Sequence, residues 1–146
     1  MEVKIKLLNR FAKLPEYKTD GSAAMDLSYA SETPLTVCPG ERILVPTGIA
    51  ISIPSSGYAA LVCARSGLSS KYGITLSNGI GVIDSDYRGE IKVAVINLGS
   101  SDYTIEPGER IAQLMFVPVE RAAISVTDSL DETQRGAGGF GSTGKD

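Results

Sequence analysis

The segment Glu90-Ile91-Lys92-Val93-Ala94-Val95 alternates large apolar residues with charged or small ones, and this alternation decides the fold class. In a β-strand, successive side chains point to opposite faces, so Ile91, Val93 and Val95 share one face. An apolar strand face has to be buried against another layer of secondary structure. We therefore predict a half-buried strand in a layered β protein.

Similar short apolar runs recur on both sides of this segment, roughly every eight to twelve residues, between turn-forming residues. The strands predicted from them are Val3–Leu8, Ile43–Val45, Ile49–Ile53, Tyr58–Cys63, Ile91–Ile96, Ile111–Val117 and Ile124–Thr127. One short helix is expected over Ser66–Gly73, with a serine N-cap and a terminating glycine. Asn78-Gly79 predicts the turn of a hairpin. The pattern indicates an all-β subunit that is either a β-sandwich, such as a jelly roll, or a barrel.

One short motif occurs twice. Pro39-Gly40-Glu41-Arg42-Ile43 recurs as Pro107-Gly108-Glu109-Arg110-Ile111, each time before an apolar run. Proline followed by glycine suits the two central positions of a type II turn, of which the second needs a positive φ. We predict two equivalent structural corners.

The composition of the chain limits its expected partners and location. The chain has 146 residues and a net charge of −3, which predicts one domain and makes nucleic acid an unexpected partner. No apolar run is as long as a membrane span and no signal peptide opens the chain, so we expect no membrane association. Cys38 and Cys63 lie in apolar runs and are expected to be buried, reduced thiols of a cytoplasmic protein.

The chain contains no histidine. This excludes a Ser-His-Asp triad, a histidine general base and a histidine–zinc site. If the protein is an enzyme, its base is expected to be a carboxylate, and its metal an oxygen-liking ion such as Mg²⁺.

The C-terminal segment is rich in glycine but also carries a cation, Arg135, and a single aromatic residue, Phe140. Such a sequence buries too little to fold alone. We predict a β domain over residues 1–132 and a flexible arm over residues 133–146 that closes over an anionic ligand with a flat face. A plain linker is the alternative, although it would need neither Arg135 nor Phe140.

Two further segments carry chemistry. Arg65-Ser66-Gly67 follows an apolar strand and could hold phosphate with a guanidinium, a hydroxyl and free amides, or could be an ordinary helix start with a surface arginine. Asp84 follows the apolar pair Val82-Ile83. Turn formation would account for most aspartates in such a setting, but a preceding buried strand favours a functional position.

Five segments in order along the chain resemble those of the homotrimeric dUTPase family. They are Ala23-Ala24-Met25-Asp26-Leu27, Arg65-Ser66-Gly67-Leu68, Asn78–Gly89, Gly108-Glu109-Arg110-Ile111-Ala112-Gln113 and Arg135–Gly144. The chain departs from the family pattern at Ala24-Met25, where Gly-Tyr is usual, and at Ala64, where proline is usual. Neither departure removes a functional group.

The resemblance implies a jelly-roll subunit that forms a homotrimer with shared active sites and hydrolyses dUTP to dUMP and pyrophosphate with Mg²⁺. Asp84 would be the general base for the attacking water, and Asp26 would act on the metal through water. Uracil would be read by the backbone around Asp84, and Tyr87 would pack under the deoxyribose. The implied substrate-binding residues are Arg65, Ser66, Gly67, Asn78, Gly81, Tyr87, Gln113, Arg135, Phe140, Gly141, Ser142 and Thr143.

Two other functions stay open at this point. The dCTP deaminases share this fold but carry a longer Arg-Ser-Ser-x-Ala-Arg segment. This chain lacks that segment at Arg65-Ser66-Gly67. A non-catalytic nucleotide-binding regulator would have no use for Asp84 or for a complete C-terminal motif.

Overall fold

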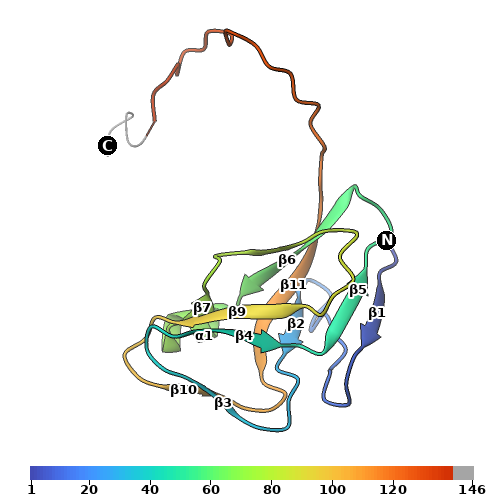
Figure 1. Cartoon of the computed structure of the whole chain (residues 1–146), viewed down its shortest axis with the longest axis vertical. Coiled ribbons are helices and arrows are strands. Elements are labelled where there is room, and N and C mark those ends of the chain that lie inside the picture. The colour runs from blue at the N-terminus through green and yellow to red at the C-terminus, as the bar shows by residue number, and fades with distance from the viewer. Residues whose placement is uncertain (140–146) are drawn as a thin grey trace.

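The structure, a computed structural model, describes residues 1–139, which form eleven β-strands and one short α-helix (Figure 1). The elements are β1 (Lys4–Leu7), β2 (Met25–Ser28), β3 (Leu35–Val37), β4 (Arg42–Pro46), β5 (Ile49–Ser52), β6 (Tyr58–Ala64), α1 (Ser66–Tyr72), β7 (Ile74–Leu76), β8 (Gly81–Ile83), β9 (Lys92–Asn97), β10 (Tyr103–Ile105) and β11 (Arg110–Pro118). The predicted all-β jelly-roll subunit with one short helix is confirmed.

Two larger sheets and two strand pairs enclose the core. The first sheet has the order β2-β11-β6-β8 and the second has the order β4-β9-β7, while β1 pairs with β5 and β10 with β3. Ile91, Val93 and Val95 are all at most 1% exposed, whereas Lys92 between them is exposed. The alternation in this segment therefore buries one strand face as predicted.

The long strand β11 lies inside the first sheet, between β2 and β6 (Figure 1). Leu114 of β11 is opposite Met25 of β2 and Val62 of β6, and all three side chains are buried. Met25 therefore belongs to the core directly beside Asp26, so the departure from the family pattern at this position is accommodated by packing.

The strands predicted before residue 118 are confirmed to within one residue at each end. The strand predicted over Ile124–Thr127 is wrong, since this segment forms neither helix nor strand and the side chains of Ile124 and Val126 are 87% and 96% exposed. A strand needs a neighbour for its backbone hydrogen bonds, and no other strand among residues 1–139 pairs with this segment.

The two Pro-Gly-Glu corners are confirmed as type II turns. Gly40 and Gly108 have φ angles of 79° and 74°, and in both corners the following glutamate amide donates to the carbonyl three residues earlier at 3.0 Å. The carboxylates of Glu41 and Glu109 accept a hydrogen bond from the backbone amide of that same earlier residue, at 2.8 and 2.9 Å. The repeated sequence therefore gives the same backbone turn and the same glutamate side-chain hydrogen bond at both corners.

Asn78-Gly79 forms a tight turn, with Gly79 at a φ of 71°, but the predicted hairpin is wrong. The strands on either side do not pair with each other, because β7 pairs with β9 and β8 pairs with β6. The turn therefore carries the chain from one sheet to the other and leaves β8 at the edge of the first sheet.

The short helix ends as predicted but begins differently. Gly73 caps its C-terminus with a left-handed φ of 74°. Its N-cap is Arg65, which makes no side-chain capping bond, so the predicted serine cap is wrong. The extended backbone of Arg65 continues directly from β6, and its side chain makes no hydrogen bond to the start of the helix.

Gly73 gives a prediction about stability. A Cβ at this position would lie 2.7 Å from the Cα of Gly99 and 2.8 Å from the carbonyl carbon of Leu98, and backbone cannot move aside as a flexible side chain can. Gly73→Ala should lower the free energy of unfolding by about 3 kcal/mol or more. Gly40→Ala is the control, because it has the same positive φ in open space and should cost only about 1 kcal/mol. Urea denaturation at a fixed protein concentration checks the difference, and equal losses would contradict the clash.

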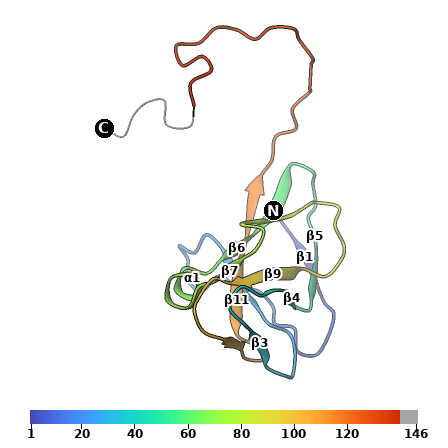
Figure 2. The same ribbon diagram turned by 60° about the vertical axis from the view of Figure 1, so that its left-hand side comes forward.

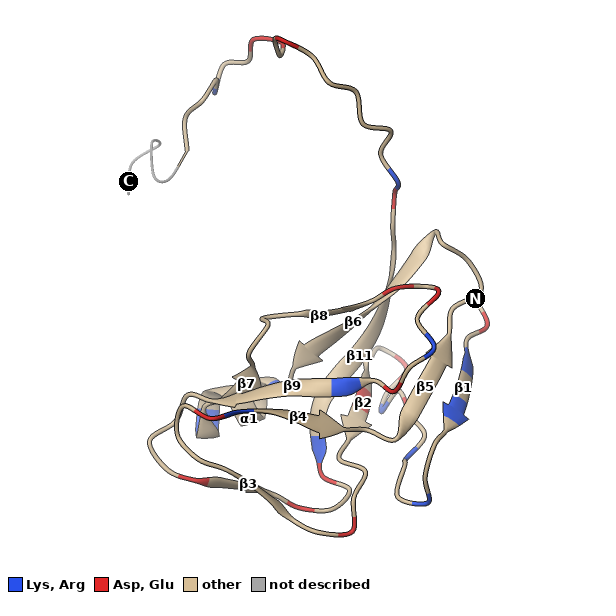
Figure 3. Ribbon diagram, in the orientation of Figure 1, with Lys and Arg blue, Asp and Glu red and all other residues tan. Residues whose placement is uncertain are grey.

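Residues 119–139 contain no helix or strand, and the segment that follows β11 leads away from the sheets (Figures 1 and 2). The boundary placed between residues 132 and 133 stays a prediction. No helix among the described residues is long and apolar enough to span a membrane. Positive and negative residues are interspersed along the ribbon (Figure 3).

The two cysteines are free thiols, but Cys38 is exposed and Cys63 is only half-buried, so the predicted burial is wrong for Cys38 and incomplete for Cys63. Cys38 follows the apolar end of β3 and begins the first Pro-Gly corner. The hydrogen bond to the Glu41 carboxylate at this corner comes from the Cys38 backbone amide and not from its side chain. The pKa of Cys38 is raised above its ordinary value, chiefly because the negative charge of Asp102 disfavours the thiolate. The thiol is therefore protonated at neutral pH.

Candidate active site

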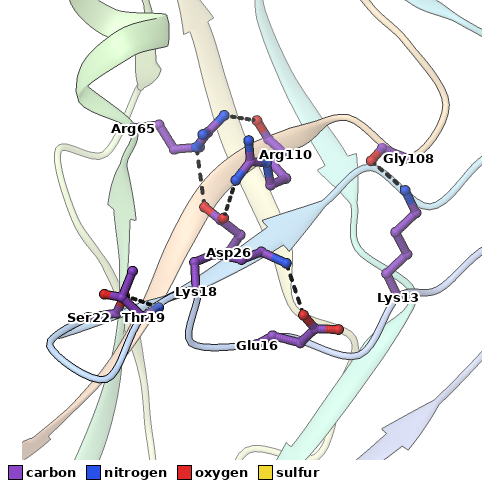
Figure 4. A network of polar contacts seen from close by, with 9 residues as sticks. All are labelled: Lys13, Glu16, Lys18, Thr19, Ser22, Asp26, Arg65, Gly108 and Arg110. Atoms are coloured by element: carbon purple, nitrogen blue, oxygen red, sulfur yellow. Dashed lines mark hydrogen bonds and ion pairs between the residues drawn. The ribbon is translucent and has the colours of Figure 1, made fainter.

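Asp26 forms the centre of a charged cluster with two arginines (Figure 4). Arg110 donates to Asp26 Oδ2 at 2.8 Å, and Nε of Arg65 lies 3.3 Å from Asp26 Oδ1. Arg65 also donates to the backbone carbonyl of Arg110 at 2.8 Å. The Asp26 side chain is only 9% exposed, so its charge is neutralised mainly by these two guanidinium groups.

Strand register brings these residues together from distant parts of the chain. Gln113 on β11 is directly opposite Asp26 on β2 and Cys63 on β6. Arg65 follows the end of β6, and Arg110 begins β11, where a register irregularity separates Arg110 from Ala112. The sheet therefore gathers Asp26, Arg65 and Gln113, three of the predicted site residues, at one end.

Arg110 was not among the predicted site residues. Its copy in the repeated motif, Arg42, makes no ion pair with any carboxylate in residues 1–139, although the two arginines follow identical turns. The motif alone could not distinguish the two arginines, because the difference arises from which strand lies alongside. β11 pairs with β2, which carries Asp26, whereas β4 pairs with β9.

The turn before Arg110 is braced by Tyr103. Its hydroxyl donates a short hydrogen bond to Oε1 of Glu109, while the other carboxylate oxygen accepts from the amide of Glu106. The pKa of Tyr103 is raised above its ordinary value, first because burial disfavours the phenolate and then because of the adjacent Glu109 carboxylate. Tyr103 therefore remains a donor at physiological pH and holds the corner that presents Arg110.

The residues around Asp26 fit a magnesium ion held through water. Asp26 Oδ1 is buried and accepts no hydrogen bond from any described residue. Mg²⁺ usually keeps several of its waters, and such a water could donate to this oxygen. Among residues 1–139, no group of three or more Asp, Glu, Cys or His residues could enclose a metal by itself. Phosphate oxygens and water would have to supply the inner ligands.

A polar hollow of about 600 Å³ lies over this cluster. Its lining includes Asp26, Arg65 and Arg110 together with the cations Lys13 and Lys18. Lys13 donates to the carbonyl of Gly108 at 2.9 Å, and Lys18 is paired with a neighbouring glutamate (Figure 4). The hollow is lined by these four basic side chains and by the three carboxylates of Glu16, Asp26 and Glu109, so its lining carries a small net positive charge, which favours an anionic ligand.

Asp84 and Tyr87 share a second hollow, of about 400 Å³. It is also lined by the apolar side chains of Leu44, Val82 and Ile83. Both Asp84 and Tyr87 are exposed, so a ligand in this hollow would meet a carboxylate and an aromatic side chain. This combination suits a small polar molecule with a flat or ring-shaped part.

The strand just before Asp84 offers its backbone to the same region. β8 pairs with β6 along one side, and its other side pairs with no strand in residues 1–139. Gly81 lies against Val62, and the side-chain amide nitrogen of Asn78 is 3.6 Å from where a Cβ on Gly81 would be. Asn78 and Gly81, two predicted substrate-binding residues, therefore lie together beside an open strand edge.

The predicted site residues do not all converge within one chain. Within the described part, the hollow around Asp26 and Arg65 does not include Asp84 or Tyr87, and the hollow around Asp84 does not include Asp26 or Arg65. Ser66 and Gly67 occupy the exposed first turn of α1, next to Arg65. Among residues 1–139, the Arg135 side chain makes only a local hydrogen bond, donating to the carbonyl of Gly138 at 2.9 Å. Phe140, Gly141, Ser142 and Thr143 lie outside the described residues.

Comparisons with known proteins agree on one family. The dUTPase family model matches residues 10–144. The chain is 52% identical to the deoxyuridine 5'-triphosphate nucleotidohydrolase of Desulfitobacterium hafniense, covering 97% of both chains. It is 55% identical to the enzyme of the same name from Rickettsia bellii, covering 98% of this chain and 95% of the relative.

The comparison with solved structures also indicates the dUTPase family. A solved structure of the Staphylococcus bacteriophage 80alpha dUTPase, a variant with dUpNHpp, superposes with a TM-score of 0.90 at 29% identity and covers 98% of each chain. Sequence, fold and the family motifs agree over nearly the whole chain. The chain therefore belongs to the dUTPase family and is an enzyme, a dUTP diphosphatase.

Proposed function

We propose that the protein hydrolyses dUTP to dUMP and pyrophosphate, with Asp84 as the general base and Mg²⁺ on the triphosphate. The observation that carries this proposal is the hollow in which the Asp84 carboxylate and the Tyr87 ring adjoin the open edge of β8. The family's curated relatives are named for this hydrolysis.

In the proposed reaction, Asp84 accepts a proton from a water molecule as the water oxygen bonds to the α-phosphorus. The bond from that phosphorus to the bridging oxygen breaks, and pyrophosphate leaves with the bonding electrons. Carboxylates are weak bases, so most of the rate enhancement has to come from positioning and from neutralising charge on the phosphates.

Uracil would be recognised by the backbone groups of β8, with help from Asn78. Backbone N–H and C=O groups cannot exchange their donor and acceptor roles, so cytosine would leave some of them unpaired. Such mismatches can cost on the order of 10⁴ in discrimination. The Tyr87 ring would pack under the deoxyribose and leave no room for a 2′-hydroxyl.

The phosphates would be bound by the cluster around Arg65, together with Ser66, Gly67 and Gln113. Magnesium, when bound, neutralises charge on the phosphate oxygens and so lowers the barrier to attack. Asp26 would hold one of its waters through Oδ1, the buried oxygen that accepts no hydrogen bond from the described residues. The C-terminal arm, with Arg135 and Phe140 to Thr143, would cover the uracil and the terminal phosphate.

Arg110 gives a prediction about substrate affinity. Arg110→Gln removes the partner of Asp26 Oδ2 and loosens the carbonyl to which Arg65 donates. Since hydrogen bonds to charged groups contribute about 1.5–3 kcal/mol, kcat/KM for dUTP should fall roughly 10-fold to 100-fold. Arg42→Gln, in the other copy of the repeat, is the matched control and should leave kcat/KM within about two-fold. Equal effects of the two substitutions in steady-state assays would show that Arg110 has no special role.

The proposed assembly is a homotrimer whose active sites are shared between subunits. Two observations support it: the two predicted halves of the site lie in separate hollows of one chain, and Ile124, Val126 and Leu130 expose large apolar side chains that a neighbouring subunit could cover. Light scattering should give three times the chain mass at assay concentrations. An active monomer would contradict this arrangement of the site.

The proposed reaction is tested by measuring pyrophosphate release from dUTP beside ammonia release from dCTP. Pyrophosphate from dUTP alone supports the proposal. Ammonia from dCTP would indicate a deaminase of the same fold, and tight dUTP binding without either product would indicate a regulator. We also propose a cytoplasmic location, since both cysteines are free thiols.

A further inference from the structure

The ring of Tyr87 is held in place by its own loop. The loop runs from β8 to β9, and within it the Tyr87 hydroxyl donates to the carbonyl of Glu90 at 3.0 Å while the Tyr87 amide donates to the carbonyl of Asp84 at 3.1 Å. The residue is 43% exposed. Its orientation therefore depends on the loop and not on burial in the core.

The side of the ring toward the loop rests on Gly89. A Cβ at Gly89 would overlap the tyrosine hydroxyl and would lie 2.5 Å from Cζ and 3.0 Å from Cε2 of the ring. Separations below 3.0 Å are essentially never seen for real Cβ atoms. Any side chain at this position would displace the ring.

The backbone of Gly89 does not itself require glycine. Gly89 is absent from the positive-φ glycines of residues 1–139, so an alanine could adopt its backbone conformation. Glycine without such a requirement costs conformational entropy on folding. The missing side chain is therefore explained by the tyrosine ring that occupies its space.

The loop is braced on both sides of this contact. Glu90 Oε1 accepts a hydrogen bond from the amide of Gly48 at 2.9 Å, which ties the residue that holds the Tyr87 hydroxyl to the turn between β4 and β5. Arg88 donates to the carbonyls of Ser85 and Tyr87 at 2.7 and 2.9 Å. With the loop fixed, a displaced ring would have to leave the position in which it lines the hollow that it shares with Asp84.

We propose that Gly89 is a positioning residue for sugar selection: its lack of a side chain forms the seat that fixes the Tyr87 ring at the depth where deoxyribose fits and ribose does not. This inference rests on the proposed function, in which Tyr87 packs under the sugar. Discrimination between deoxyribose and ribose then depends on two residues. Tyr87 supplies the ring, and Gly89 leaves the space that the ring occupies.

The test compares the full-length wild type with Gly89→Ala, Tyr87→Ala and the double variant, in kcat/KM for dUTP and for UTP. Gly21→Ala is the control, because Gly21 has open space around it and no positive φ. In Gly89→Ala, the dUTP-to-UTP ratio should fall roughly 10-fold to 100-fold, the range expected when a close-fitting pocket is disturbed by about one methyl group. In the Tyr87→Ala background, the same substitution should leave the ratio unchanged.

An unchanged ratio in Gly89→Ala, or an equal fall with and without the Tyr87 ring, would overturn the inference. The position of the ring is read separately from crystal structures of the Gly89→Ala and Gly21→Ala proteins. A displaced phenol in the first and not in the second supports the proposed seat, and an undisplaced phenol in Gly89→Ala overturns it whatever the activity. Failure of the wild type to release pyrophosphate from dUTP would instead contradict the proposed function.

Discussion

Asp84→Asn should bind dUTP with nearly unchanged affinity and hydrolyse it roughly 10²–10⁴ times more slowly than the wild type. Asparagine keeps the shape of the side chain but cannot accept the proton of the attacking water. Asp84 is exposed and lines both the hollow that it shares with Tyr87 and another one that it shares with Asp86 and Arg121, so the substitution should not disturb the core. Single-turnover kinetics and calorimetric binding of a non-hydrolysable dUTP analogue separate the chemical step from affinity.

The neighbouring Asp86 provides a matched control. It is also exposed, lies two residues along the same loop, and lines one of the hollows that contain Asp84. Asp86→Asn should retain turnover within a few-fold of the wild type. If Asp86→Asn lost turnover and Asp84→Asn did not, Asp86 would be the base and the assignment would be wrong.

Deleting Gln134–Asp146 should lower turnover by about 10² or more and leave the folded body intact. The deletion removes Arg135 and Phe140 to Thr143, the residues proposed to cover the uracil and the terminal phosphate. Losing a positioned cation and precise substrate placement in phosphoryl transfer typically costs at least this factor. Residues 134–139 form no strand, so circular dichroism and the melting temperature should stay near those of the full chain.

The control for this deletion removes only Gly144–Asp146, which contains no proposed binding residue, and should keep full activity. Two results would distinguish an active arm from a plain linker. Full activity of the chain ending at Thr133 would show that the C-terminal motif is a linker. A trimer that dissociates on truncation would show instead that this segment contributes to assembly.

The regular parts of the fold could be predicted from local sequence. Ile91, Val93 and Val95 follow the two-residue period of a strand, and the burial of these side chains confirms it. Gly40, Gly73 and Gly108 end or turn their elements with positive φ, as their places in the sequence predict. In each case the conformation depends on residues only a few positions apart, so the sequence pattern alone predicts it.

Local sequence failed where the outcome depended on a distant partner. Asn78-Gly79 predicts a hairpin, but the strands that flank it pair with β9 and β6 instead of with each other. Ile124–Thr127 has the composition of a strand but no neighbouring strand among residues 1–139. The exposed thiol of Cys38 was predicted to be buried, because an apolar run does not reveal which of its residues begins a corner.

The family, the strand periodicity, the two type II corners and the residues proposed for catalysis could be read from the chain alone, because motifs and turns are encoded by neighbouring residues. Which arginine of the repeated motif reaches Asp26 could not, and neither could the space beneath Tyr87 that Gly89 leaves free. Both depend on contacts between separate strands or on the exact path of a loop. Strand pairing selects Arg110 over Arg42 although their local sequences match, since only β11 lies beside the strand that carries the carboxylate.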